Sequence, residues 1–123
     1  MTTNRPTIIA HRGASAAHRE NTVGAFVAAG PLGADAVELD VRRTADGALV
    51  VHHDAVLADG RTIVDLARSE VPSEVPGLAE ALDACGELVV NVEIKNSPPD
   101  ADFDPAETVA AGVIAELRRR GAP

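Results

Sequence analysis

The segment from Gly33 to Gly47, GADAVELDVRRTADG, constrains the fold most, because apolar residues alternate there with acidic ones. This alternation predicts a β-strand whose aliphatic side chains face one way while Glu38 and Asp40 face the other. Two residues of strand separate the carboxylates by roughly 6.6 Å. At an effective dielectric of about 20 they repel each other by on the order of 2.5 kcal/mol. Their face therefore lies in water, or a cation or basic residue lies between them.

Shorter apolar segments predict strands and helices in alternation along the rest of the chain. Asp46 and Gly47 predict a tight turn, Asn21 and Asp104 are expected helix caps, and between residues 54 and 76 only 63–68 suggests a helical turn. This order indicates an α/β fold in a single domain, residues 1–123, with a parallel sheet and helices outside it. Strands are expected at residues 6–10, in the alternating segment, at 48–53 and at 88–95, and helices at 21–29, 76–85 and 104–120.

Composition narrows the class of protein. Eleven basic residues against nineteen acidic ones give a net charge of −8, which argues against nucleic-acid binding and against an anionic lipid surface. Cys85 is the single cysteine, so we expect no intrachain disulfide and a small packed thiol in a reducing compartment. No segment reaches the roughly 20 apolar residues of a membrane span. We therefore expect a cytoplasmic protein without stable membrane insertion.

Polar residues lie at or near the carboxyl end of every predicted strand. In parallel α/β folds the carboxyl ends of the strands carry the active site. Three carboxylates there suit a hard cation, Mg²⁺ or Ca²⁺, two imidazoles suit a general acid and a general base, and an arginine and a lysine suit a phosphate. The residues concerned are His11, Arg12, Glu38, Asp40, His53, Glu93 and Lys95.

Each of these residues also has a plainer interpretation. A histidine at a strand end is commonly a surface residue, the Glu38–Asp40 face can be solvated, and Lys95 beside Glu93 can be a surface charge pair. The arginines at 118–120 are expected to form the solvated end of a helix, where they suit the helix dipole. The coincidence of polar residues at one edge of the sheet is what favours a site.

In their order and spacing, these motifs resemble the glycerophosphodiester phosphodiesterases, within the wider superfamily that includes phosphatidylinositol-specific phospholipase C. The resemblance is carried by HRG at 11–13, EN at 20–21, the run at 33–54 and EIK at 93–95. It implies a (β/α)₈ TIM barrel, of which this chain would hold the N-terminal half with about four strands. It also implies hydrolysis of a small-molecule glycerophosphodiester to an alcohol and sn-glycerol 3-phosphate.

The resemblance also implies a role for each site residue. His11 and His53 would be the general acid and base, Arg12 would contact the phosphate, Lys95 would line the substrate pocket, Glu20 would lie at the edge of the site, and Glu38, Asp40 and Glu93 would hold a divalent cation, Mg²⁺ or Ca²⁺. The sequence departs from the family in two places. Arg19 stands where the family usually has proline, which would loosen the loop without removing chemistry. The segment between His53 and Pro76 is shorter than usual, which concerns the pocket wall that selects the alcohol.

The chain is also shorter than the typical barrel of ~250 residues. It is expected to be a fragment or truncated product, a half-barrel that self-associates through exposed sheet edges, or a divergent small fold, and we favour the first. The alternative function is a truncated, non-catalytic remnant that binds metal or phosphoester without turnover. A third hypothesis is a structural α/β domain whose polar strand ends carry no chemistry.

Overall fold

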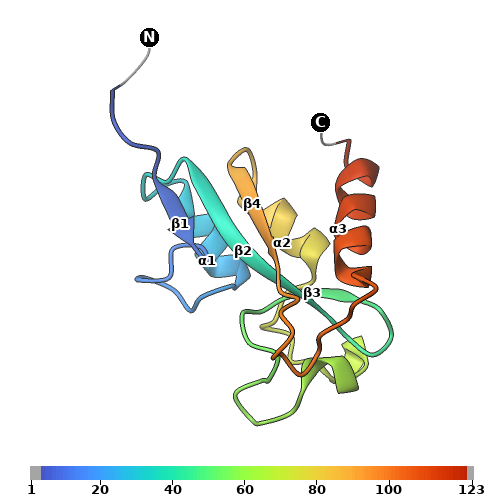
Figure 1. The fold of residues 1–123 in the computed structure, drawn as a ribbon. Coiled ribbons are helices and arrows are strands. Elements are labelled where there is room, and N and C mark those ends of the chain that lie inside the picture. Colours follow the sequence, from blue (N-terminus) through green and yellow to red (C-terminus); the bar gives the residue numbers. More distant parts are fainter. Residues whose placement is uncertain (1–3, 122–123) are drawn as a thin grey trace.

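The computed structural model describes residues 4–121 and is organised around β2 (Ala36–Arg43). β1 (Ile9–His11) and β4 (Val89–Ile94) run parallel to β2 on opposite edges, since Glu38 pairs with one residue from each. β3 (Leu49–Val51) completes a four-stranded sheet. Figure 1 shows β2 crossing the molecule between its neighbours. The acidic strand is thus the centre of the fold.

β3 corrects the prediction of an all-parallel sheet, because it runs antiparallel to β2. The turn at residues 44–47 is too short for the crossover that parallel strands require, and Thr44 closes it through backbone and side-chain hydrogen bonds with Ala48. The hairpin folds the chain back along β2, and the His52 amide donates to the Asp40 carbonyl at 3.0 Å. His53 thereby returns to the level of the acidic residues.

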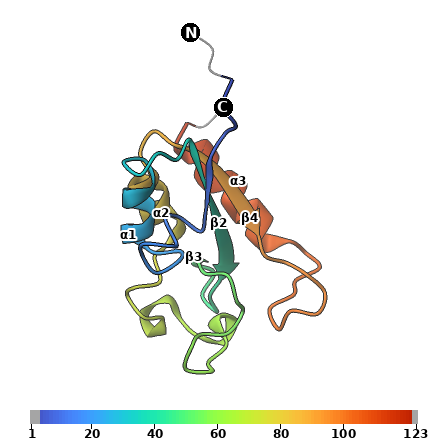
Figure 2. The ribbon, with the colours of Figure 1, turned by 90° about the vertical axis from the view of Figure 1, so that its left-hand side faces the viewer.

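The three helices pack against the aliphatic face of the sheet, and Figure 2 shows α1 and α2 together on one side of it. They are α1 (Val23–Ala29), α2 (Leu78–Cys85) and α3 (Thr108–Arg119). No helix within residues 4–121 has the length and apolar character needed to cross a bilayer. The shared core consists of Phe26, Ala29, Val37, Leu39, Val41, Val51, Leu78, Ala81, Leu82, Cys85, Val109 and Val113.

Two helix starts differ from the prediction because side chains found other partners. Thr22, not Asn21, caps α1 by accepting a hydrogen bond from the Ala25 amide. Asp104 accepts from the amides of Ala106 and Thr108, so it closes a turn that precedes α3. The remaining element ends agree with the prediction to within three residues, as is usual for element ends.

The segment at residues 54–76 forms a second, smaller core. It contains two 3₁₀ turns, η1 (Ile63–Asp65) and η2 (Arg68–Glu70), which include the helical turn predicted near 63–68. The aliphatic side chains of this segment pack beneath Val50 of β3. They are spaced irregularly along the sequence, so no periodic pattern predicts them. The cluster consists of Val50, Leu57, Ile63, Leu66, Val71 and Val75.

Gly13 fixes the loop that leaves β1. Its φ is +81°, and a Cβ atom there would lie 2.7 Å from the Ala25 Cβ of α1. Only glycine tolerates both that backbone conformation and that approach. The backbone amide of Asn21 donates a hydrogen bond to the Arg12 carbonyl at 2.9 Å and so closes the same loop. The loop therefore presents Arg12 and Asn21 to the polar face of β2.

Candidate functional site

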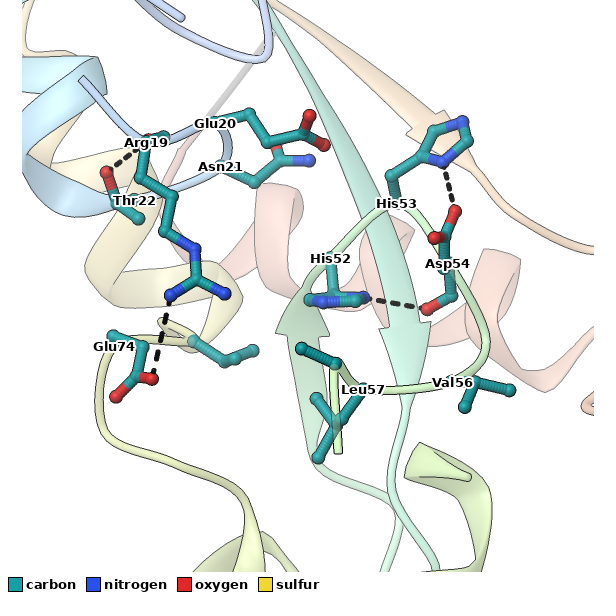
Figure 3. Close-up of a pocket in the computed structure, with 12 residues that line it drawn as sticks. Arg19, Glu20, Asn21, Thr22, His52, His53, Asp54, Val56, Leu57 and Glu74 are labelled. Atoms are coloured by element: carbon teal, nitrogen blue, oxygen red, sulfur yellow. Dashed lines mark hydrogen bonds and ion pairs between the residues drawn. The ribbon is translucent and has the colours of Figure 1, made fainter. Parts of the chain in front are cut away.

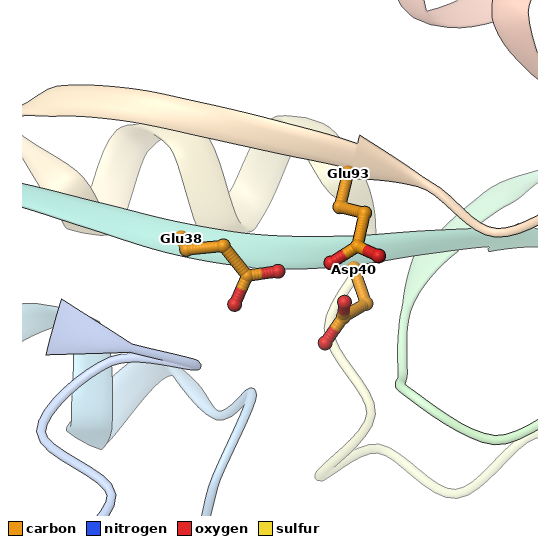
Figure 4. Close-up of side chains that lie close together, drawn as sticks. All are labelled: Glu38, Asp40 and Glu93. Atoms are coloured by element: carbon orange, nitrogen blue, oxygen red, sulfur yellow. The ribbon is translucent and has the colours of Figure 1, made fainter. Parts of the chain in front are cut away.

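Three carboxylates meet on the polar face of the sheet (Figure 4). Glu38 and Asp40 point from β2, and Glu93 lies opposite Asp40 on the neighbouring strand β4. One oxygen from each lies within 4.8 Å of the others. Glu38 is 6 % exposed and Asp40 is fully buried, whereas Glu93 is half-exposed. The structure thus brings together the three carboxylates that the sequence pattern singled out.

Polar and basic side chains surround Asp40. Nδ2 of the Asn21 side chain donates to Asp40 Oδ2 at 2.9 Å, and Arg12 Nε lies 3.6 Å from the same oxygen. Lys95 Nζ lies 3.8 Å from Asp40 Oδ1 and donates to Glu93 Oε1 at 3.0 Å. Glu38 and Asp40 are therefore buried with basic partners nearby, and they do not form the solvated face considered from the sequence.

The two histidines come from the edge of β2 that faces away from β4, because β1 and β3 both pair with that edge. His11, at the end of β1, places Nε2 3.5 Å from Glu38 Oε2, and its ring is two-thirds exposed. His53 is one-third exposed, and its Nδ1 lies 2.6 Å from Asp54 Oδ1. This contact fixes the orientation of the His53 ring and leaves Nε2 as the nitrogen available for another partner.

A cleft of about 630 Å³ opens beside His53 (Figure 3). Glu20, at its border, accepts two hydrogen bonds from Arg12 Nη1, at 3.0 and 3.2 Å. Arg19 reaches across toward Glu74, with 3.9 Å between the charged groups. The cleft is lined by Arg19, Glu20, Asn21, Thr22, His52, His53, Asp54, Val56, Leu57, Ala58, Glu74 and Val75.

Comparison with known proteins accounts for this arrangement. The profile of the "Glycerophosphoryl diester phosphodiesterase family" matches residues 11–122, which include every residue of the site. The chain belongs to this family. A glycerophosphodiester phosphodiesterase of Caldanaerobacter subterraneus is 38 % identical in a match that covers 72 % of this chain and 45 % of that relative. The resemblance that the motifs suggested is thereby confirmed.

Solved structures of the family share the fold. A glycerophosphodiester phosphodiesterase of Thermotoga maritima is 31 % identical with a TM-score of 0.80, over 95 % of this chain and 52 % of that one. A phosphodiesterase of Oleispira antarctica, solved in complex with the product sn-glycerol-3-phosphate, is 28 % identical with a TM-score of 0.83, over 96 % and 53 %. The chain thus has part of a (β/α)₈ barrel, as predicted, and spans about half the length of these relatives.

The donor set of the site fits a hard cation. Glu38 Oε1 and Asp40 Oδ1 are buried and have no hydrogen-bond partner among the described residues. Buried acceptors without a donor are costly, and buried charges are normally paired or bound to a metal. Carboxylate oxygens are the ligands that Mg²⁺ and Ca²⁺ prefer. The acidic cluster of this family member could therefore hold a metal ion.

Crowding of the carboxylates shifts the pKa values of both buried ones. Burial, followed by Asp40 and then Glu93, raises the pKa of Glu38 to about 8. Burial also disfavours ionisation of Asp40, but the hydrogen bond from Asn21, followed by the proximity of Glu38 and Glu93 and the charge of Lys95, outweighs it and lowers the pKa of Asp40. At neutral pH without metal, Glu38 is therefore protonated beside an ionised Asp40.

The metal-free protein should lose stability as pH rises from about 5 to 9. A carboxyl whose pKa rises from 4.5 unfolded to about 8 folded stabilises the folded state below pH 4.5, and that stabilisation is lost as the pH passes 8. The lowered pKa of Asp40 acts only below its ordinary value of 3.8, outside this range. Urea unfolding in the presence of a chelator should show that the free energy of unfolding falls by a few kcal/mol over this pH range. Glu38→Gln should remove most of this fall. If the free energy of unfolding of the variant depended on pH as that of the wild type does, the prediction would be wrong.

Two residues of the site were not assigned to it from the sequence. Asn21 was expected to cap α1, yet its φ is +53° and its buried side chain donates to Asp40. Asp54 follows His53 and holds its ring. Each of the two follows a motif residue in the sequence, Asn21 after Glu20 and Asp54 after His53, and this position could have indicated a role in the site. Only the folded loops show that their side chains turn toward it.

Proposed function

We propose that this chain is the N-terminal, single-domain half of an enzyme that hydrolyses glycerophosphodiesters to an alcohol and sn-glycerol 3-phosphate. The observation that carries the proposal is the convergence of Glu38, Asp40 and Glu93, two of which have a buried oxygen without a hydrogen-bond partner among the described residues. His11 lies beside Glu38, and His53 lines the cleft. The product bound in the Oleispira antarctica relative supports the choice of substrate.

The proposed roles follow from the contacts. Glu38, Asp40 and Glu93 hold a divalent cation, Mg²⁺ or Ca²⁺, which supplies charge neutralisation at the phosphoryl oxygens when bound. Arg12 and Lys95, whose cationic groups border the acidic cluster, attract the phosphate. Glu20 holds the Arg12 guanidinium at the mouth of the cleft.

The two histidines divide the proton transfers. One imidazole takes a proton from the nucleophile, and the other gives a proton to the leaving alkoxide. His53 borders the cleft beside the acidic cluster, and Asp54 occupies its Nδ1, so Nε2 is the nitrogen that exchanges the proton. The cleft beside His53 has room for the alcohol part of the substrate.

The direct test is release of sn-glycerol 3-phosphate from glycerophosphocholine by the purified protein with Mg²⁺ or Ca²⁺. We expect release with metal and none after chelation, since the buried carboxylates would then repel the phosphate. Metal binding in a calorimeter without any release would instead support the non-catalytic remnant. Absence of both would contradict the proposal and leave a structural domain.

The remnant remains the second candidate because the chain spans about half the length of the solved relatives. A partial barrel also leaves the outer edges of β1 and β4 without a strand partner among the described residues, and unpaired edges favour self-association. The cytoplasmic location stays a prediction. The mass of the purified protein in solution tests the self-association.

A further inference from the structure

Arg42 is a buried arginine on the polar face of β2, two positions beyond Asp40. It is 4 % exposed, and each of its three nitrogens faces a partner from another segment. Nε donates to the His53 carbonyl at 2.9 Å, Nη1 donates to both carboxylate oxygens of Asp102 at 2.7 and 2.8 Å, and Nη2 lies 3.6 Å from Asp100. This residue therefore joins β2 to two separate loops.

Asp102 anchors one of these loops, between β4 and α3. Its side chain is 2 % exposed, and its carbonyl accepts from Arg43 Nη1 at 2.8 Å. The loop is also closed on itself, because Asn96 exchanges two hydrogen bonds with the backbone of Asp104. Asp102 thus restrains the Arg42 guanidinium, because both of its carboxylate oxygens accept from Nη1 in a buried, charge-assisted contact.

The other loop carries His53. β3 ends at Val51, and the last backbone hydrogen bond in register with β2 is the one from the His52 amide to Asp40. The His53 carbonyl lies beyond that ladder, where Arg42 Nε donates to it. A charged donor that is itself locked by a buried carboxylate makes a stronger restraint than a neutral one.

We propose that Arg42, held by Asp102, is a positioning residue that orients His53 for catalysis by restraining its backbone. The inference rests on the proposed function, in which His53 transfers a proton. Arg42 forms no hydrogen bond or ion pair with Glu38, Asp40 or Glu93 among the described residues, and the cleft residue to which it donates is His53. The pair joins residues 60 positions apart in the sequence.

The test replaces the pair with apolar residues of similar size, Arg42→Met together with Asp102→Leu. Such double replacements of buried ion pairs commonly keep a protein folded, whereas one unpaired charge does not. The matched control is Arg61→Met with Asp59→Leu, which removes an exposed ion pair of the adjoining loop. Wild-type and variant proteins are compared by NMR of the histidine rings, which is tractable because the chain has four histidines.

We expect the His53 ring signal, assigned with His53→Ala, to shift or broaden in the Arg42/Asp102 variant while the His18 signal stays in place. With glycerophosphocholine and Mg²⁺, kcat should fall about tenfold to a hundredfold with KM little changed, the pattern of a misplaced catalytic group. The control variant should match the wild type in both readouts.

An unchanged His53 signal or an unchanged kcat in the folded variant would overturn the proposal. If the double variant does not fold, Arg42→Lys is judged by the same criteria, because lysine keeps the charge but loses the donor to the His53 carbonyl. If the wild type shows no turnover, the proposed function has failed, and the ring signals alone then decide whether Arg42 positions His53.

Discussion

Replacing His53 with alanine should lower turnover of glycerophosphocholine by about 10²- to 10⁴-fold, the usual contribution of a general acid or base. His53 borders the cleft, and its ring is oriented by Asp54 at 2.6 Å, which leaves Nε2 as its available nitrogen. It makes no contact with Glu38, Asp40 or Glu93 in the structure, so metal affinity should stay unchanged. Steady-state kinetics and calorimetry measure the two quantities.

The exposed His18 is the matched control, since His18→Ala removes an imidazole from the loop after β1 without touching the acidic cluster. It should leave both turnover and metal affinity at the wild-type level. Turnover of His53→Ala equal to that of His18→Ala would exclude a proton-transfer role for His53.

His11 offers a related comparison. Its Nε2 lies 3.5 Å from Glu38, so His11→Ala should lower turnover while affecting metal affinity little. A combined loss of turnover and metal affinity would show instead that His11 is a ligand or supports one.

Asp40→Asn should weaken binding of Mg²⁺ or Ca²⁺ by on the order of a hundredfold or more, because loss of a residue that only supports a ligand already costs about 10- to 100-fold. Asparagine keeps the shape of the side chain but lacks the charge that a hard cation requires. Asp40 is fully buried and reaches the volume shared with Glu38 and Glu93, so water cannot easily take its place. Titration calorimetry gives the affinity.

The stability of Asp40→Asn should change much less than its metal affinity. The substitution removes the negative charge that disfavours ionisation of Glu38, but it also loses the attraction of Asp40 to Arg12 and Lys95, and these effects oppose each other. Asp59→Asn, at an exposed acidic residue, is the control and should bind metal as the wild type does. Wild-type metal affinity in Asp40→Asn would mean that Asp40 is not a ligand.

Residues that repeat at strand period were the most predictable part of the site. Alternation alone placed Glu38 and Asp40 on one face of β2, because successive side chains of a strand point to opposite sides. The turn at Asp46 and Gly47 was equally predictable, because it depends on neighbouring residues. A tight hairpin makes β3 antiparallel to β2, however, and the prediction of four parallel strands ignored that geometry.

Residues in loops were the least predictable. Asn21 has the ordinary chemistry of a helix cap, and nothing in its neighbours shows that it turns at φ +53° toward Asp40. The aliphatic residues of 54–76 lack any period, yet they form a core of their own beneath β3. In both cases contacts with distant segments outweighed local preference.

Residue type and the fixed periods of strand and helix were enough to tell which face of β2 is acidic and which motifs accompany it along the chain. The meeting of Glu93 with Glu38 and Asp40 was expected from the order of the strands. The return of His53 through the β3 hairpin and the pairing of Arg42 with Asp102 emerged only from the folded chain. These are contacts between separate segments, and they depend on how the helices and loops close around the sheet, which no local pattern of residues encodes.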